Sequence, residues 1–576
     1  MAAINKSQRI RALVVMGMLT FGFLAVFYRL ADIMLIDHDW YLHKARGQQV
    51  RKEINPVKRG TIYDRRGREL AINLETESIF CNPADISSAG DVARALAAAT
   101  KADEKTIYAR LVTNKRFSWI ERKMDTMQAR QIRDLKLKGV GLIPEMKRIY
   151  PKGMLASHVV GFVNLDNKGV EGVEGGYDRY LSSKEESKLV TRDAKGNHLS
   201  TGTNREIRGN NVTLTIDEGL QYILEKNLDA AMIKWKASAA TAIMMDPYTG
   251  EILALANRPT FNPTDLSNVD MNEVRNRAIT DVFEPGSTFK VVVGIAALEE
   301  KTVKSGTRID CSAGFVEVGG KRIKDDHRHG VLSFHEVIQK SSNVGTIKTA
   351  LMLGKDKVYE YIKKFGFGDK TGIDLQGEIS GLLRHSDKWS GMSIGSIAIG
   401  QEIGVTPLQI VRAYAVVANG GYLVTPHVVK EIRDPDGALI MKAETKAERI
   451  ISEATVATFR EILKTVTEEG GTAVKAAVEG NSVAGKTGTA QIYDPKTKRY
   501  SKTRYIASFV GFVPADNPRL AMVVVIKEPK GSIYGGLVAG PLFRDIANQA
   551  LSYLTVPMDK TNDKGMVVLA DKEEKH

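Results

Sequence analysis

The sequence predicts an α+β protein. An antiparallel sheet, flanked by helices and joined to a helical lobe, follows a transmembrane helix and an irregular α/β segment. An apolar run near the N-terminus, and a basic stretch rich in turn signals after it, indicate the first two parts. The remaining chain has strands, then helices, then strands and a last helix, which indicates the sheet and its lobe. The 576 residues are enough for two to four domains, at roughly 150 residues each.

Composition narrows the class of protein further. Charged residues make up 26% and hydrophobic residues 43%, which excludes a disordered or collagen-like chain. Two cysteines exclude a disulfide scaffold and a Cys-rich zinc site. The net charge of +14 leaves nucleic acid, an anionic membrane or an anionic polymer as candidate partners.

The N-terminus predicts a membrane anchor. Residues 12–28 are uncharged, which gives about 17 residues, at the short end of the 17–25 that a spanning helix needs. Lys6, Arg9 and Arg11 precede this run without an acidic residue, so the N-terminus is expected in the cytoplasm and the rest of the chain outside it. A cleaved signal peptide is the alternative. An uncleaved anchor is favoured because no small-x-small cleavage site follows directly.

An exported location argues against nucleotide and nucleic-acid chemistry. The sequence has no P-loop, no dinucleotide fingerprint and no HExxH motif. His327 and His329 flank Arg328 and could hold a metal ion, but an exposed polar loop is the favoured interpretation. No cofactor, metal or nucleic acid is therefore expected.

The elements can be predicted in order along the chain. Residues 29–50 continue as a polar helix, and residues 51–205 form a module of short strands with many turns. The following segment alternates in period two and then becomes amphipathic. Strands are expected at 211–217, 240–246, 251–257, 483–492, 505–513 and 520–526, and helices at 218–235, within a helix-rich stretch from 287 to about 420, and at 542–554.

Ser287 and Lys290 form the first motif with chemical potential. They follow Pro285-Gly286 at the start of an apolar helix, so the two side chains lie on the same helix face. A neutral lysine within reach of a hydroxyl can take its proton, and burial or a second cation can keep the lysine neutral. The structural alternative is a helix-capping serine beside a surface lysine.

Two further motifs follow. Ser341-Ser342-Asn343 lies between two helical stretches, where a hydroxyl and an amide can relay a proton and bind a peptide group; a helix-capping loop is the alternative. Lys486, Thr487, Gly488 and Thr489 lie in an apolar strand. A glycine there indicates a close approach by another segment, and the charge and hydroxyls suit an anionic ligand. The same triplet at 370–372 is interpreted as a turn.

The order of the three motifs is more specific than any one of them. It is the order of the penicillin-binding proteins and class A β-lactamases. The chain resembles a class B penicillin-binding protein of the division type, and the resemblance covers almost the whole sequence. The segments that carry it are Arg59–Ala71, Tyr150–Glu174, Arg275–Lys290, Gln339–Gly345, Gly404–Gln409, Ala484–Gln491 and Gly535–Phe543.

The resemblance implies a penicillin-binding, β-lactamase-like fold and a peptidoglycan D,D-transpeptidase. Ser287 would attack the penultimate D-Ala carbonyl of a stem peptide and Lys290 would be the general base. Ser341 would relay a proton to the leaving amine and Asn343 would hold a substrate amide. Lys486 would keep the site positive, and backbone N–H groups of Ser287 and Thr489 would form the oxyanion hole. Substrate-binding residues would be Thr487, Gly488 and Thr489.

The resemblance also implies location and partners. The chain would be a single-pass protein of the cytoplasmic membrane with its bulk in the periplasm. Its partners would be stem peptides, β-lactams as covalent inhibitors, a SEDS-family glycosyltransferase and divisome proteins. Five parts are expected: a cytoplasmic N-terminus (1–11), an anchor (12–30), a pedestal (31–205), a transpeptidase domain (206–556) and a charged tail (557–576).

Several alternatives remain open at this point. The elongation-type class B protein is the nearest one, because residues 400–407 depart from the usual division pattern. A β-lactamase, which shares the three motifs, is a further alternative. The others are a D,D-carboxypeptidase that passes the acyl group to water and a non-catalytic β-lactam sensor that uses the same fold as a binding module. Cys81 and Cys311 are expected to be two buried thiols because they lie in different modules.

Overall fold

The computed structural model describes residues 6–54, 57–183, 187–191, 208–494, 496–497 and 499–560. The expected boundary at residues 205 and 206 and the tail after residue 560 lie outside these ranges. Contacts divide the chain into two units. The first comprises residues 1–58 and 183–207, and the second comprises residues 59–182 and 208–576.

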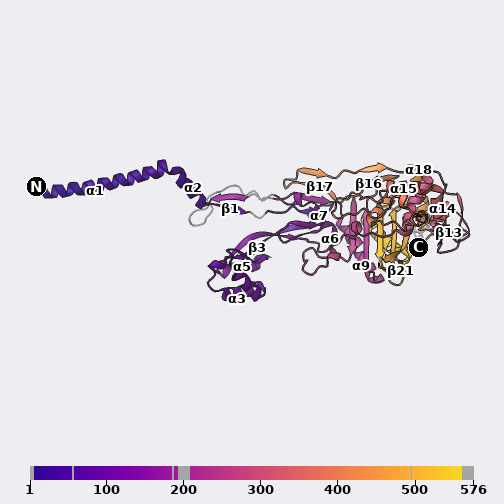
Figure 1. Ribbon diagram of the computed structural model, residues 1–576, viewed down its shortest axis with the longest axis horizontal. Helices are drawn as coiled ribbons and strands as arrows, with labels where there is room; N and C mark the ends of the chain where they lie inside the picture. The colour runs from indigo at the N-terminus through magenta and orange to yellow at the C-terminus, as the bar shows by residue number, and fades with distance from the viewer. Residues whose placement is uncertain are drawn as a thin grey trace, which may run out of the picture. The chain divides into compact units, whose positions relative to one another are not determined.

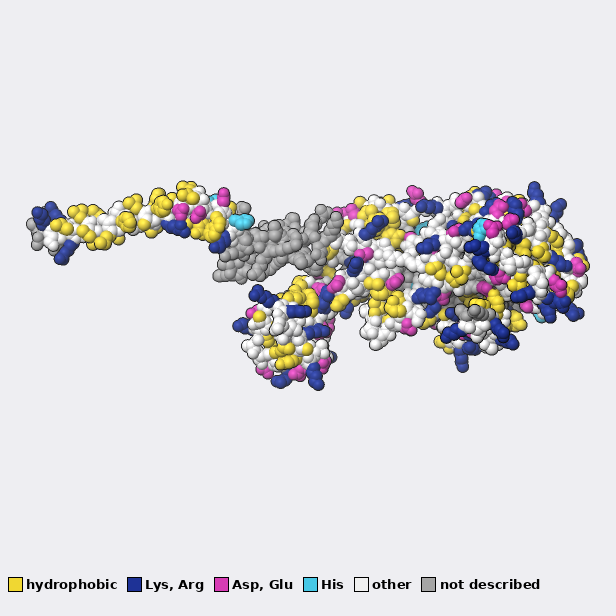
Figure 2. Space-filling view, in the orientation of Figure 1, with side chains coloured by type: hydrophobic (Ala, Val, Ile, Leu, Met, Phe, Trp, Pro, Cys, Tyr) yellow, Lys and Arg dark blue, Asp and Glu magenta, His cyan; other side chains and the backbone are white. Residues whose placement is uncertain are grey.

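The first unit contains an apolar helix that fits a single-pass membrane anchor. Helix α1 (Lys6–Ala31) carries large apolar side chains around its whole surface, and Phe21 and Phe23 are 75% and 76% exposed. Figure 2 shows these apolar groups along the helix. The span that is long and apolar enough to cross a membrane is Arg9–Ile36. The polar helix expected to follow is interrupted by a π-helical turn (Asp32–Ile36) before α2 (His38–Gln49). After α2, strand β1 (Val50–Ile54) pairs with β8 (Ser187–Thr191).

The second unit is built on a five-stranded antiparallel sheet in the order β11-β10-β22-β21-β20. Its strands are apolar over most of their length, and they confirm the α+β class that the sequence predicts. The order explains how early and late segments of the chain meet, because β10 pairs with both β11 and β22. The strands are β10 (Ala239–Met245), β11 (Ile252–Arg258), β20 (Ala484–Asp494), β21 (Arg499–Val513) and β22 (Leu520–Lys527).

Helices cover both faces of this sheet. Along β10, Ala242 and Met244 pack with α9 (Glu218–Trp235) and α19 (Gly535–Tyr553), while Ile243 and Met245 point to the opposite core. That opposite core contains α12 (Lys290–Glu299) and α17 (Pro407–Ala418), and every residue of α17 is buried. Figure 1 shows α9 beside the sheet that contains β21.

The helical lobe contains small strands that the sequence does not indicate. The hairpin of β13 (Phe315–Val318) and β14 (Lys321–Lys324) turns at Gly319-Gly320, whose positive φ angles suit a two-residue hairpin loop. The other elements of this lobe are β12 (Arg308–Asp310), β15 (Val331–Ser333), α13 (Phe334–Gln339), α14 (Asn343–Leu353), α15 (Lys355–Lys364), α16 (Ser393–Ala398), β16 (Tyr422–Val424), β19 (Ala447–Arg449) and α18 (Glu453–Thr465).

A second large sheet joins strands from residues 62–149 to strands from residues 211–442. Its order is β18-β17-β9-β2-β3-β4, with β5 on the other side of β3. Strand β2 (Ile62–Tyr63) pairs in parallel with β9 (Asn211–Leu214). The helices α3, α4 and α5 are not indicated by the sequence and cover a small separate core. The remaining bounds are β3 (Glu69–Cys81), α3 (Ala89–Thr100), α4 (Glu104–Leu111), β4 (Ser118–Met124), α5 (Thr126–Asp134), β5 (Val140–Ile149), α7 (Gly172–Gly176), α8 (Asp178–Leu181), β17 (Val429–Arg433) and β18 (Leu439–Lys442).

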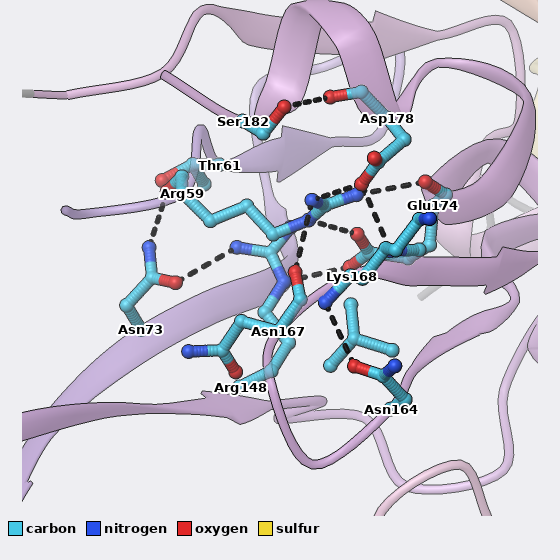
Figure 3. Close-up of polar contacts among 12 residues, drawn as sticks. Arg59, Thr61, Asn73, Arg148, Asn164, Asn167, Lys168, Glu174, Asp178 and Ser182 are labelled. Carbon is cyan, nitrogen blue, oxygen red and sulfur yellow. Dashed lines mark hydrogen bonds and ion pairs between the residues drawn. The ribbon is translucent and has the colours of Figure 1, made fainter. Parts of the chain in front are cut away.

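A buried ion cluster joins the residues before β2 and the end of β5 to helices α7 and α8 (Figure 3). The Glu174 carboxylate, which is fully buried, accepts from Arg59 Nε at 2.5 Å and from Arg148 Nε at 2.6 Å. Arg59 also donates to Asp178 Oδ1 at 2.6 Å and to the Asn167 carbonyl at 3.2 Å. Because both arginines are 4% exposed, their charges depend on Glu174 and Asp178 for compensation.

Removing the central carboxylate of this cluster is expected to destabilise the protein. Glu174→Gln leaves two buried guanidinium groups with only Asp178 as counter-charge, which costs about 3–5 kcal/mol in the free energy of unfolding. Asp91→Asn is the matched control, since its ion pair with Arg94 lies in solvent and contributes almost nothing. Urea denaturation of the detergent-solubilised chain measures both. Equal stability of the two variants would contradict this role for Glu174.

The last helix corrects one expectation. The sequence predicts a helix that starts after Pro541, but α19 begins at Gly535 and contains the proline. A proline inside a helix costs roughly 3 kcal/mol, and burial of Val538, Ala539 and Leu542 on the helix offsets this. Both cysteines, Cys81 and Cys311, are buried free thiols.

Candidate active site

Ser287 lies on a rigid turn at the entrance to α12. Residues Gly286–Phe289 form a 3₁₀ turn, and the Gly286 N–H donates to the Gly400 carbonyl at 3.1 Å. Tyr414 Oη donates to the Thr288 carbonyl at 2.9 Å from the buried helix α17. Ser287 itself is half-buried and caps neither the 3₁₀ turn nor α12. The structure therefore does not support the alternative of a helix-capping serine.

Lys290 is a fully buried amine with three acceptors. Its Nζ donates to the Ser341 carbonyl at 2.6 Å, to Ser341 Oγ at 3.2 Å and to Asn343 Oδ1 at 2.9 Å. Within the described part of the chain, no hydrogen bond joins it to Ser287. These contacts use all three protons of an ammonium group, so loss of one proton gives the amine a lone pair beside the Ser341 hydroxyl. An exposure of 0% excludes the alternative of a surface lysine.

Burial lowers the proton affinity of this amine. Desolvation lowers the pKa of Lys290 to about 7, against the opposing charges of Asp325 and Asp326. Near neutral pH the amine is therefore present both with and without its proton. Lys486 is also buried, and its own burial together with the charge of Lys290 holds the pKa of Lys486 well below the usual lysine range.

The third motif lies on β20 against the serine turn. A Cβ atom on Gly488 would lie 2.8 Å from the Pro285 carbonyl oxygen and 2.4 Å from Ser508 Oγ, so only glycine permits this approach. The approach expected at Gly488 is thus made by the segment that carries Ser287. Thr489, which is half-buried, accepts from the Gly535 N–H at 3.0 Å and so holds the start of α19.

The other two side chains of the third motif, those of Lys486 and Thr487, make polar contacts beside the strand. Lys486 Nζ donates to Thr487 Oγ1 at 3.4 Å, and Thr487 Oγ1 lies 3.1 Å from Thr472 Oγ1. Thr487 is 8% exposed. Lys486 is 1% exposed and thus presents no ammonium group to solvent.

The second motif adopts an unusual backbone. Ser341 has a φ of +60°, which is uncommon for a residue with a side chain. Ser342 caps α14, with its Oγ accepting from the Gly345 N–H at 2.9 Å. Asn343 donates from Nδ2 to the Lys324 carbonyl at 3.1 Å, which turns its Oδ1 towards Lys290. The capping alternative therefore holds for Ser342, while Ser341 and Asn343 face the buried amine.

The structure adds Asp325, which the sequence does not indicate. Its carboxylate accepts hydrogen bonds from the Ser342-Asn343-Val344 segment.

Two sequence motifs lie outside the site. His327, which the sequence offers as a candidate metal ligand, is exposed, and among the described residues no three potential ligands gather for a metal ion. The second triplet, at 370–372, lies in a loop where Thr371 donates to Glu378, in agreement with its interpretation as a turn.

Comparisons with known proteins identify the family. Residues 240–548 match the penicillin binding protein transpeptidase domain, and residues 54–214 match the penicillin-binding protein dimerisation domain. The chain is 36% identical to stage V sporulation protein D of Bacillus subtilis, over 96% of this chain and 87% of that protein. It is 34% identical to peptidoglycan D,D-transpeptidase FtsI of Escherichia coli, over 94% of this chain and 92% of that protein.

Solved structures agree with this assignment. Penicillin binding protein 3 of Mycobacterium tuberculosis in complex with aztreonam has a TM-score of 0.69 at 28% identity, covering 88% of this chain and 98% of that one. A peptidoglycan synthetase of Bifidobacterium adolescentis has a TM-score of 0.70 at 27% identity, covering 89% and 98%. The chain belongs to the class B penicillin-binding proteins and is a peptidoglycan D,D-transpeptidase.

Proposed function

We propose that transpeptidation proceeds through an acyl-enzyme on Ser287. The Ser287 hydroxyl attacks the carbonyl of the penultimate D-Ala of a stem peptide, and the terminal D-Ala leaves as an amine. Neutral Lys290 takes the hydroxyl proton, and Ser341 relays a proton to the leaving amine. An amine from a neighbouring stem peptide then attacks the ester, which forms the cross-link and frees the serine.

The other site residues bind and polarise the substrate. The N–H groups of Ser287 and Thr489 stabilise the oxyanion, a contribution of about 2.7–4 kcal/mol for one donor. Thr487 and Thr489 receive the terminal carboxylate beside Gly488, and the protonated form of Lys486 supplies positive charge that favours neutral Lys290. Asn343 holds a substrate amide and, from its Oδ1, the amine of Lys290.

One observation carries this proposal. Lys290 is fully buried with a pKa of about 7, and it contacts Ser341 and Asn343 while lying one helical turn after Ser287. A lysine that is partly neutral at the working pH is what a general base requires.

Mapping the covalent adduct tests the mechanism. After reaction with a penicillin and proteolysis, we expect mass spectrometry to place the adduct on the peptide that contains Ser287. Incubation with peptidoglycan precursors and a polymerising partner should yield dimeric muropeptides, which separates transpeptidation from hydrolysis of the acyl-enzyme. An adduct on another residue, or trimmed monomers alone, would contradict the proposal.

We also propose that the cross-links are those of septal wall, with residues 31–205 as pedestal and 206–556 as the transpeptidase domain in the periplasm. Anchor and pedestal would contact a SEDS-family glycosyltransferase and divisome proteins. The basic residues Lys6, Arg9 and Arg11 before the apolar span of α1 support this orientation. Similarity to FtsI supports the division role.

Depletion in the native host tests the septal role. Cells without the protein should filament, and a variant with α1 replaced by an unrelated spanning helix should restore division poorly. Rounded cells would indicate the elongation role instead. Full rescue by the helix-replaced variant would remove the partner claim for the anchor.

A further inference from the structure

A group of aromatic rings lies outside the active site, in the part of the chain that matches the dimerisation domain. Phe80 on β3 pairs across the sheet with Trp119 on β4 and, on its other side, with Gly141 on β5. Ile79 and Ile120, the neighbours of the two aromatic residues, point to the opposite face, into the small core that α3, α4 and α5 share. The rings therefore stand on the face of this sheet that is turned away from that core.

Phe117 forms the exposed top of this aromatic group. Its ring stacks on Phe80, with the ring centroids 5.2 Å apart and the planes at 17°, and it meets Trp119 edge-on at 4.9 Å. Phe80 in turn lies over Gly141, where a Cβ atom would be 2.5 Å from the Phe80 ring. One face of the Phe117 ring is thus held, while the residue remains 43% exposed. A rigid ring with an open face loses little conformational entropy when a ligand stacks on it.

Positive charge surrounds this ring. Lys115 and Arg116 directly precede Phe117 and are exposed, and within the described residues neither takes part in an ion pair. Residues 82–139, which we call the head, contain twelve Lys and Arg against seven Asp and Glu. Figure 2 shows Lys and Arg side chains over the visible face of the head, the part that carries α3 and α5 in Figure 1. Such a surface attracts an anionic partner.

The size of the exposed aromatic surface favours a sugar over a protein partner. Phe80 and Trp119 are partly buried beneath and beside Phe117, so one ring supplies most of the open face. The apolar core of a stable protein interface needs a larger area, within about 800 Å² on each partner. A single ring flanked by two cations matches one sugar unit and a carboxylate beside it.

We propose that the head binds the glycan strand of peptidoglycan, with a sugar ring stacked on Phe117. The face of a pyranose ring that carries axial C–H groups is apolar and slightly positive, which suits the negative face of an aromatic ring. The carboxylates along the polymer suit Lys115 and Arg116. The chain thus holds its polymeric substrate at a second place, independent of the Ser287 motif.

Cosedimentation with purified sacculi tests this site, with the full chain in detergent and saturated with a penicillin. Phe117→Ala should weaken binding about tenfold. Phe117→Leu should do the same, because leucine keeps an apolar side chain but lacks the ring face, whereas Phe117→Trp should bind like wild type. Tyr108→Ala is the matched control, since Tyr108 is a 47% exposed aromatic residue of α4 on the same head, and it should bind like wild type.

Denuded glycan, from which an amidase has removed the stem peptides, identifies the ligand. It keeps the sugar rings and the lactyl carboxylates, so binding and its dependence on Phe117 should remain. The double variant Lys115→Gln/Arg116→Gln should bind more weakly, and its binding should depend less on salt than that of wild type.

Equal binding of the Phe117→Ala and Tyr108→Ala variants to sacculi would overturn the stacking role. Loss of binding on denuded glycan would place the contact on the stem peptide and would also overturn the proposal. Each variant should be labelled by a fluorescent penicillin to the same extent as wild type, which separates these outcomes from a failure of the fold or of the catalytic mechanism. If Phe117→Ala unfolds, Phe117→Leu decides.

Discussion

Replacing Ser287 with alanine is expected to abolish covalent labelling by a fluorescent penicillin and to abolish cross-linking. Acyl transfer needs an oxygen that can form the ester, and alanine supplies none. The fold should be kept, because Ser287 caps no helix and its neighbours Gly286 and Thr288 are held through backbone contacts. Gel fluorescence after saturating reaction measures the labelled fraction.

An exposed serine provides the control for this experiment. Ser267 lies in a surface turn and bonds Asp265, so Ser267→Ala should be labelled to the same extent as wild type. Stoichiometric labelling of the Ser287→Ala variant would show that another residue is the nucleophile.

Replacing Lys290 with methionine is expected to slow acylation by about 10²–10⁴-fold, the usual contribution of a placed general base. Methionine fills the buried space without a titrating group, although the Ser341 carbonyl and Asn343 Oδ1 lose their donor. Because burial lowers the pKa of Lys290 to about 7, wild-type acylation should fall as pH drops below that value and the amine takes up a proton. The decrease should be about tenfold for each pH unit.

The pH profile separates a missing base from a disturbed loop. Lys290→Met should lose the acid limb as well as the rate, since no amine remains to titrate. Lys301→Met, at an exposed lysine after α12, is the control and should keep both. Stopped-flow fluorescence across about pH 5–9 provides the measurement. An acid limb near 7 in the Lys290→Met variant would assign proton transfer to another group.

The parts of the fold that the sequence predicts are those whose pattern is complete within one segment. Helix α9 begins and ends where its amphipathic pattern does, and the five central strands fall on the predicted segments. The helices α3, α4 and α5 are short, and they are stabilised by a shared core to which strands β3 and β4 also contribute. Their existence depends on tertiary contacts that local periodicity does not contain.

The same distinction applies to the candidate site. The order of the three motifs indicates that Ser287, Ser341 and Lys486 act together. The position of Gly488 in a strand indicates the close approach that the structure has to Pro285. Asp325 has no such signal, because its role depends on a hairpin that places it against α14. The sequence pattern singles out the nearby histidines, whereas Asp325 makes the hydrogen bonds to the start of α14.

The parallel pairing of β2 with β9 has a consequence for the biogenesis of the protein. The Thr61 N–H bonds Asn211 Oδ1 across 150 positions of the chain, so a strand exported early must wait for a partner exported much later. Contacts of such long range form slowly. A secreted fragment that starts after the pedestal would keep every catalytic residue but leave one edge of β9 unpaired, open to pairing with another molecule. In the intact chain, pairing with β2 covers this edge of β9.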